Sequence, residues 1–249
     1  MDFYLNKEDF EKAKFFFRPF VESFEPDNNH TEHINMHYDS FVVEIHANQH
    51  TSISSRIDRV MDEIHHDLFY RMNVKTWMTG DTTVFIPSPN NHVIIVFTHF
   101  LKHFYKGGLG LRQICDWCRL LWKYRTSVDI ELLKNLLDRM GTINIWKAFA
   151  SFAVDYLGMP LEAMPFYSSD PRYKKKAQRI FDFVFEVGNF GHNRDNSYYT
   201  KYPRLIRKTI SLSYRVRDIF RHSHIFPIES MRFFPTIVFD GVRLALRGE

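Results

Sequence analysis

The segment FVVEIHA places a carboxylate and an imidazole within a short apolar stretch. Side chains alternate between the two faces of a β-strand. Phe41, Val43 and Ile45 therefore share one face, while Glu44 and His46 share the other. The acid on that second face is either a solvated charge or a functional carboxylate. The imidazole could hydrogen-bond a carboxylate or a phosphate, and a structural role is the alternative.

Two further histidines have a spacing that suits one face of a helix. His99 and His103 lie at positions i and i+4 in the apolar segment THFLKHFY. This spacing suits a zinc pair, but the Glu that follows the first His in a metalloprotease helix is absent. We therefore expect a buried polar cluster or contacts to a bound ligand. Lys102 could reach a phosphate, with a surface lysine as the plainer interpretation.

The next helical segment carries one more charged pair and both cysteines. Arg112 and Asp116 are again four positions apart, which an intrahelical ion pair explains. Cys115 and Cys118 form C-x-x-C, but the pattern around them is helical, with no βαβ unit and no second cysteine pair. We expect neither a thioredoxin-like nor a zinc role for them.

The elements that must position these groups are mixed in the first third of the chain. We expect a strand at Asp2, followed by a helix over 7–18 that Asn6 caps. The segments EHINMHY and FVVEIHA flank a polar turn and predict a hairpin over 33–46. An amphipathic helix over 52–71 follows, and then a short extended piece, TTVFIPSP.

From Ser88 onward the pattern is helical almost to the end. Pro89 suits the first position of a helix, and Gly107 and Gly108 end it. LGLRQICDWCRLLWKYR predicts the next helix, and further helices are predicted over 129–140, 144–157, 172–187, 203–221 and 229–246. The fold class is therefore α+β, with a small α/β part over 1–86 and a larger all-helical domain over 87–249.

Composition is that of a globular protein. The chain has 249 residues, 45% hydrophobic and 25% charged, and its 25 Phe predict a bulky core. The net charge of +4 permits an anionic partner without requiring one. Charges throughout the first 20 residues argue against a signal peptide, and no apolar run is long enough for a membrane span. We expect a cytoplasmic protein with reduced thiols and no membrane partner.

Several of these segments resemble the uncharacterised nucleotidyltransferase family of the polymerase-β-like superfamily. The resemblance covers about residues 1–120. It is carried by MDFYLNKEDFEKAK, by FVVEIHA, and by THFLKHFYKGGLGLRQICDWCRLL through His99, Lys102, His103, Leu111, Arg112 and Asp116. It implies that the α/β part is a partial nucleotidyltransferase-like lobe.

The resemblance also implies roles for the acids. Asp2 matches the second carboxylate of a D-x-D pair, and Glu44 matches a third carboxylate on the neighbouring strand. Both would be catalytic ligands of Mg²⁺, with a solvated acid as the alternative for Asp2. The first Asp and a Gly-rich motif would precede Met1, so we expect that upstream residues are missing, through a late start codon or a fragmented gene. A domain that begins at Met1 is the alternative.

The implied activity is transfer of a nucleoside monophosphate from an NTP to an acceptor by a two-metal mechanism. The implied contacts to the nucleotide or the second substrate come from His46, His99, Lys102, His103 and Arg112. Without the first Asp and the Gly-rich motif, we expect this chain to be inactive or nearly so. The sequence leaves open the base of the NTP, and whether the acceptor is a protein, a small antibiotic-like molecule, a sugar or tRNA.

A non-catalytic interaction module, or one that binds nucleic acid, is the alternative function. It would use the basic segment RLIRKTISLSYRVRDIFRHSH, whose cationic residues are Arg204, Arg207, Lys208, Arg215, Arg217 and Arg221. These residues spread around the helix, so a solvated face is the first interpretation and a phosphate-rich partner such as RNA the second. An incomplete sheet would also leave an edge strand open to self-association.

Overall fold

A computed structural model describes residues 2–20, 23–24, 33–38, 41–191, 193–194 and 197–246. The chain divides into two compact units. The first comprises Met1–His50 and Met61–Val74, and the second comprises Thr51–Val60 and Lys75–Glu249. The proposed division into domains at residues 86 and 87 stays a prediction.

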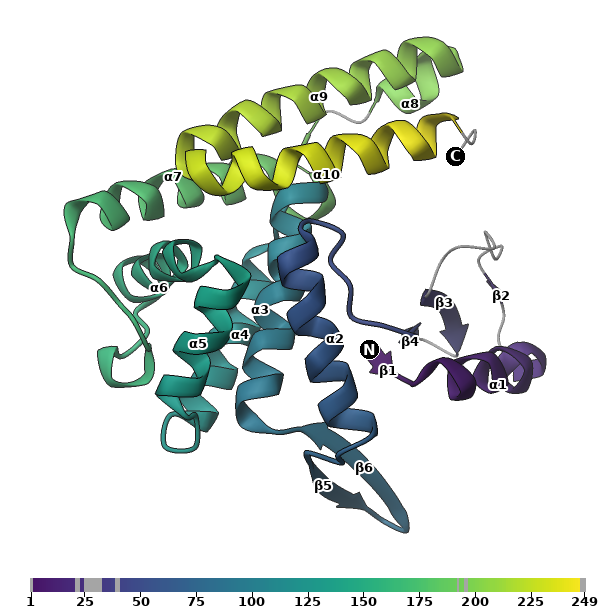
Figure 1. The fold of residues 1–249 in the computed structure, drawn as a ribbon. Coiled ribbons are helices and arrows are strands. Elements are labelled where there is room, and N and C mark those ends of the chain that lie inside the picture. The colour runs from purple at the N-terminus through teal and green to yellow at the C-terminus, as the bar shows by residue number, and fades with distance from the viewer. Residues whose placement is uncertain are drawn as a thin grey trace. The chain divides into compact units, whose positions relative to one another are not determined.

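The first unit contains a small mixed sheet (Figure 1). Its strands are β1 (Asp2–Tyr4), β2 (Ser23–Phe24), β3 (His33–Tyr38) and β4 (Phe41–His46), in the order β1-β4-β3-β2. β3 and β4 pair antiparallel, with Ile34 opposite Ile45, which confirms the predicted hairpin. Its predicted turn, Asp39–Ser40, lies outside the described residues. β1 pairs with β4 in parallel, so it is an edge strand among the described strands.

Helix α1 (Lys7–Phe17) packs its apolar side into the core of the first unit. The Asn6 side chain accepts a hydrogen bond of 2.9 Å from the Asp9 backbone N–H, which confirms the predicted cap. The core consists of Phe10, Ala13, Ile34, Met36, Ile45 and Ala47. Because Ile45 belongs to this core, the alternate positions of β4 must lie on the opposite face of the sheet.

Helix α2 (Ser55–Phe69) is shorter at both ends than the predicted 52–71. The extended piece after it is larger than predicted, because β5 (Val74–Thr79) pairs with β6 (Thr82–Pro87) in a two-stranded sheet. The prediction missed β5. Gly80, at φ +56°, lies in the two-residue connection between these strands.

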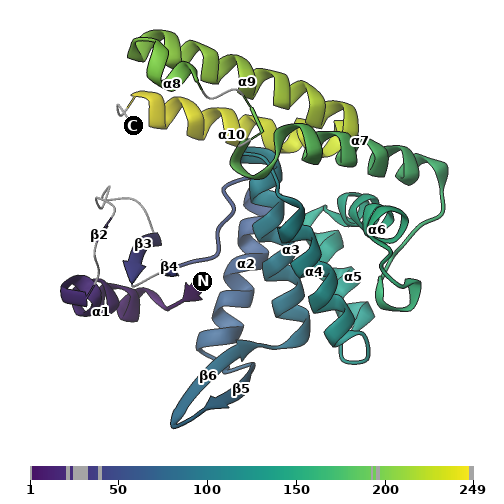
Figure 2. The same cartoon turned by 180° about the vertical axis from the view of Figure 1, so that it is seen from behind.

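The described residues after Pro87 form helices (Figures 1 and 2). The α-helices are α3 (Pro89–Lys106), α4 (Leu111–Tyr124), α5 (Ile130–Met140), α6 (Ile143–Leu157), α7 (Pro171–Val187), α8 (Tyr198–Lys201), α9 (Arg204–Ile225) and α10 (Pro227–Leu246). The sequence pattern predicted all of these except the short α8. α9 and α10 lie side by side in both views, and they pack against each other.

Aromatic side chains fill the core of the second unit, as the Phe content predicts. Phe97, Phe100, Trp117 and Trp146 are fully buried. Edge-on contacts join them, with ring centroids 5.2 Å apart for Phe97 and Phe100 and 4.7 Å apart for the two tryptophans.

The end of α3 depends on glycine. Gly108 has a φ of +105°, and a Cβ at this position would lie 2.6 Å from the carbonyl oxygen of Gly188, just after α7. No other residue type fits both the backbone angle and the space, so this glycine lets the ends of α3 and α7 approach closely.

Candidate metal centre

The parallel pairing of β1 with β4 brings the predicted acids together. Asp2 lies opposite Glu44, and Tyr4 lies opposite His46. Because side chains alternate along both strands, these four residues share the face of the sheet that is opposite α1. The structure therefore places a carboxylate, a phenol, a carboxylate and an imidazole on adjacent strands.

Three of these side chains converge. One ligand atom each from Asp2, Glu44 and His46 lies within 4.8 Å of the other two. The Nε2 atom of His46 is 3.6 Å from Oε2 of Glu44. The side chain of Glu44 is 37% exposed and that of His46 is 12% exposed, while Asp2 is exposed. The cluster is therefore open to solvent at its carboxylates and closed at its imidazole.

The ring of Tyr4 packs against the imidazole of His46, and the carboxylates of the cluster act on its hydroxyl. Its ring stacks on His46, with centroids 5.1 Å apart and an angle of 23° between the planes. Burial raises the pKa of the Tyr4 hydroxyl well above its usual range, and the carboxylates of Asp2 and Glu44 raise it further. The two carboxylates place negative charge beside Tyr4, which favours a cation. Tyr4 was not among the predicted site residues, although its i+2 spacing from Asp2 indicates a shared face.

The donor set fits a divalent cation. Carboxylate oxygens are the ligands that Mg²⁺ prefers, and an imidazole nitrogen is a common ligand of transition metals. Among the described residues, this cluster is the one place where three or more such side chains converge.

The other predicted residues lie in the second unit. His99 and His103 form a half-buried pair on α3, with their Nε2 atoms 2.9 Å apart, so one ring donates a hydrogen bond to the other. This agrees with the predicted polar cluster. Lys102, on the same helix, is half-buried. Arg112 is 93% exposed, and its Nε lies 3.8 Å from Oδ2 of Asp116, as expected for an intrahelical ion pair.

The C-x-x-C segment has no reactive thiolate at its second position. Cys118 is buried in α4, and both cysteines are thiols. Burial, followed by the neighbouring Cys115, raises the pKa of the Cys118 thiol to about 12. The Cys118 thiolate is therefore scarce at neutral pH. The expectation that the two cysteines have no redox role stays a prediction.

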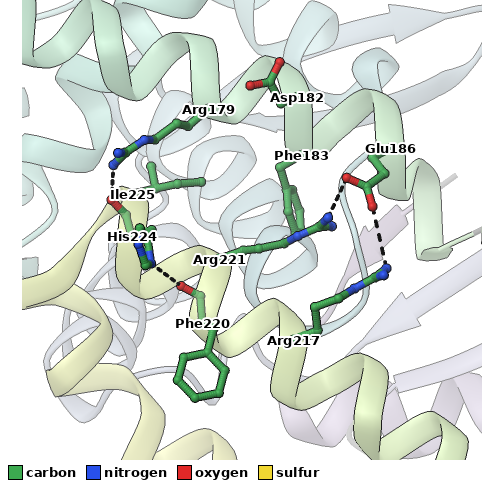
Figure 3. A pocket seen from close by; sticks show the side chains of 9 residues that line it. All are labelled: Arg179, Asp182, Phe183, Glu186, Arg217, Phe220, Arg221, His224 and Ile225. Carbon is green, nitrogen blue, oxygen red and sulfur yellow. Dashed lines mark hydrogen bonds and ion pairs between the residues drawn. The ribbon is translucent and has the colours of Figure 1, made fainter.

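A cavity of about 400 Å³ is lined by residues of α7 and α9 (Figure 3). Its arginines are engaged within the protein. Arg221 donates to Glu186 at 2.5 Å, Arg217 lies 3.7 Å from the same carboxylate, and Arg179 donates to the His224 carbonyl. The hydrogen bond from Arg221 lowers the pKa of Glu186. These contacts offset much of the positive charge, so the cavity is a weaker candidate than the cluster on the sheet.

The fold and the cluster together define an α+β protein that presents a carboxylate–imidazole group from adjacent strands of a small mixed sheet. The sequence model of a family described as "Uncharacterised nucleotidyltransferase" matches residues 1–158, so the chain belongs to this family. The match extends beyond the first 120 residues, which carry the resemblance described above. Comparison with curated proteins gave no match. Comparison with solved structures gave none either. Within the described ranges, no helix is both long and apolar enough to cross a membrane.

Proposed function

We propose that this protein belongs to a nucleotidyltransferase system that moves a nucleoside monophosphate from an NTP to an acceptor, with Asp2 and Glu44 as the catalytic ligands of Mg²⁺. The observation that carries the proposal is the β1–β4 register, which pairs Asp2 with Glu44 on one face. Family membership supplies the reaction class.

Each residue of the cluster has a distinct part in this proposal. Asp2 and Glu44 would hold the cation from neighbouring strands, and their separation is fixed by the backbone hydrogen bonds of the sheet. In a two-metal reaction, divalent cations supply positive charge to the attacking and leaving oxygens of an in-line displacement. The stacked ring of Tyr4 keeps His46 from rotating away from the carboxylates.

Residues of the second unit are proposed to contact the NTP or the acceptor. Arg112 is open to solvent, because its side chain is 93% exposed. His99, Lys102 and His103 offer further donors on α3, and Lys102 is the one with a fixed positive charge. Arg112→Ala should raise the KM for the NTP more than it lowers kcat if this contact is made to the ground-state nucleotide.

We also propose that the 249-residue chain alone is inactive or nearly so. The two-metal mechanism uses a further bridging carboxylate, whereas the cluster of described residues contributes two carboxylates and an imidazole. Groups that act as one unit lose most of their effect when one is missing.

The test is NTP consumption with Mg²⁺, followed for this chain and for one extended by the in-frame codons upstream of Met1. Faster turnover by the extended chain, lost in Glu44→Gln, supports the proposal. Equal turnover by both chains that survives Asp2→Ala and Glu44→Ala contradicts the site. A stop codon directly upstream, together with absent turnover, favours the non-catalytic module.

Self-association through β1 is a separate proposal. This edge strand carries Phe3, which is 44% exposed. An unpaired strand edge beside an apolar side chain can pair with a second copy. Size-exclusion chromatography over a range of concentrations should show a dimer that Phe3→Lys weakens, and a monomer at every concentration would contradict this.

A further inference from the structure

We propose that His46 is a third ligand of the cation held by Asp2 and Glu44, and that its nitrogen makes the centre prefer a first-row transition metal such as Mn²⁺ over Mg²⁺. This inference rests on the proposed function, because it assumes that the carboxylate cluster holds a cation. It goes beyond that function by naming a ligand of different chemistry and the ion that this ligand selects.

The position of His46 fits a ligand. Its register partner is Tyr4, so it lies one alternate position beyond the Asp2–Glu44 pair on the same face of the sheet. Two ligands at about 2.1 Å from one ion, at right angles, lie about 3 Å apart, and opposite ligands lie about 4.2 Å apart. The separation of 3.6 Å between His46 Nε2 and Glu44 Oε2 falls between these values. It is also longer than an ordinary hydrogen bond.

The imidazole is held in place before any ion binds. Its side chain is only 12% exposed, and the ring of Tyr4 stacks on it at 5.1 Å. A histidine with only a solvating role on a sheet surface would have freedom to turn toward water. Here the ring is packed on one side and faces the carboxylate on the other, so the nitrogen lies beside the groups that would attract an ion.

The chemistry of the donors then sets the choice of ion. Mg²⁺ takes oxygen ligands and dehydrates reluctantly. Mn²⁺ also accepts carboxylates, and as a first-row transition metal it gains more than Mg²⁺ from an imidazole nitrogen. Two oxygens and one nitrogen therefore shift the preference toward Mn²⁺, whereas three oxygens would not.

The experiment is pulsed electron paramagnetic resonance on the 249-residue chain loaded with Mn²⁺, with no nucleotide present. We expect the modulation of a directly bound ¹⁴N, and its replacement by a ¹⁵N signal when histidine alone is isotopically labelled. His46→Gln should abolish the signal and weaken Mn²⁺ binding by about tenfold or more, with a smaller effect on Mg²⁺. His50→Gln is the matched control, because His50 lies in the same unit and pairs instead with Asp62 at 2.6 Å.

The outcomes separate the two proposals. If Mn²⁺ binding is lost in Glu44→Gln but the spectrum shows no histidine nitrogen, the role of His46 is overturned, while the metal centre of Asp2 and Glu44 is supported. Mn²⁺ binding that is indifferent to Glu44→Gln overturns the metal centre, and the role of His46 falls with it. If His46→Gln fails to fold, a labelled wild-type chain that binds Mn²⁺ without a histidine nitrogen signal still overturns the role of His46, and Mn²⁺ binding by Glu44→Gln still tests the metal centre.

Discussion

Replacing His222 with phenylalanine should reduce the loss of stability that the second unit suffers at acid pH. His222 is 1% exposed, and its ring packs against Phe104 at 4.5 Å and Phe183 at 4.9 Å. Burial is the main cause that lowers its pKa from 6.5 to about 3, and the positive charges of Arg194 and Arg221 lower it further. The folded state therefore holds this histidine neutral.

The sign and size of the effect follow from proton linkage. Below pH 6.5 the unfolded chain binds a proton at this position that the folded chain does not, so stability is lost as the pH falls from 6.5 toward 3. Each pH unit in this window costs about 1.4 kcal/mol. At pH 5 the loss attributable to His222 is about 2 kcal/mol. Phenylalanine, which cannot titrate and suits the aromatic surroundings, should remove this part of the pH dependence.

Urea denaturation at pH 7.5, 6 and 5, followed by tryptophan fluorescence, measures the effect. Trp117 and Trp146 are fully buried in the same unit and report its unfolding. His224→Gln is the control, because His224 is on the same helix but exposed. If His222→Phe loses as much stability between pH 7.5 and pH 5 as the unchanged chain, His222 is not the buried neutral group described here.

Two comparisons test the packing of the second unit. Gly108→Ala should lower the free energy of unfolding by at least about 2 kcal/mol, because Gly108 lies against the end of α7. Gly80→Ala should lower it by about 1 kcal/mol, because Gly80 has a positive φ but open space around it. Equal shifts of the two variants in thermal melting would contradict the close approach at Gly108. Asp218→Ala should lower the free energy of unfolding by about 3–5 kcal/mol, because it removes the carboxylate partner of Arg194. The side chains of this pair are each only 13% exposed. Asp116→Ala breaks an exposed pair and should cost less than about 1 kcal/mol in the same melts.

Local pattern was enough to predict most elements of the fold. The alternation in FVVEIHA predicted that Ile45 and Glu44 lie on opposite faces of the sheet, and the burial of Ile45 in the core of the first unit agrees with this. Helix boundaries marked by a cap or a glycine, such as those at Asn6 and Gly107, are correct within a residue or two. Local signals suffice here because each element carries its own periodicity and its own start and stop residues.

The misses have three different causes. β5 lies in VKTWMT, just before Gly80 and Asp81, and this local hairpin signal is visible in the sequence. β2 has two residues and no pattern to detect. The pairing of Asp2 with Glu44 joins positions 42 residues apart, so spacing alone could not show it; the family resemblance suggested it. The stacking of Tyr4 on His46 depends on the same pairing and was likewise hidden.

The central claim, that the cluster of Asp2 and Glu44 serves nucleotidyl transfer, is tested most directly by following the label from NTPs carrying ³²P at the α-phosphate. The longest chain that the reading frame encodes would be incubated with divalent cation and a cell extract as the source of acceptors. We predict cation-dependent transfer of the label to an acceptor, lost in Glu44→Gln and retained in Glu11→Gln, which changes an exposed acid of α1. Equal transfer by all three chains, or transfer that persists when the cation is chelated, would contradict the account.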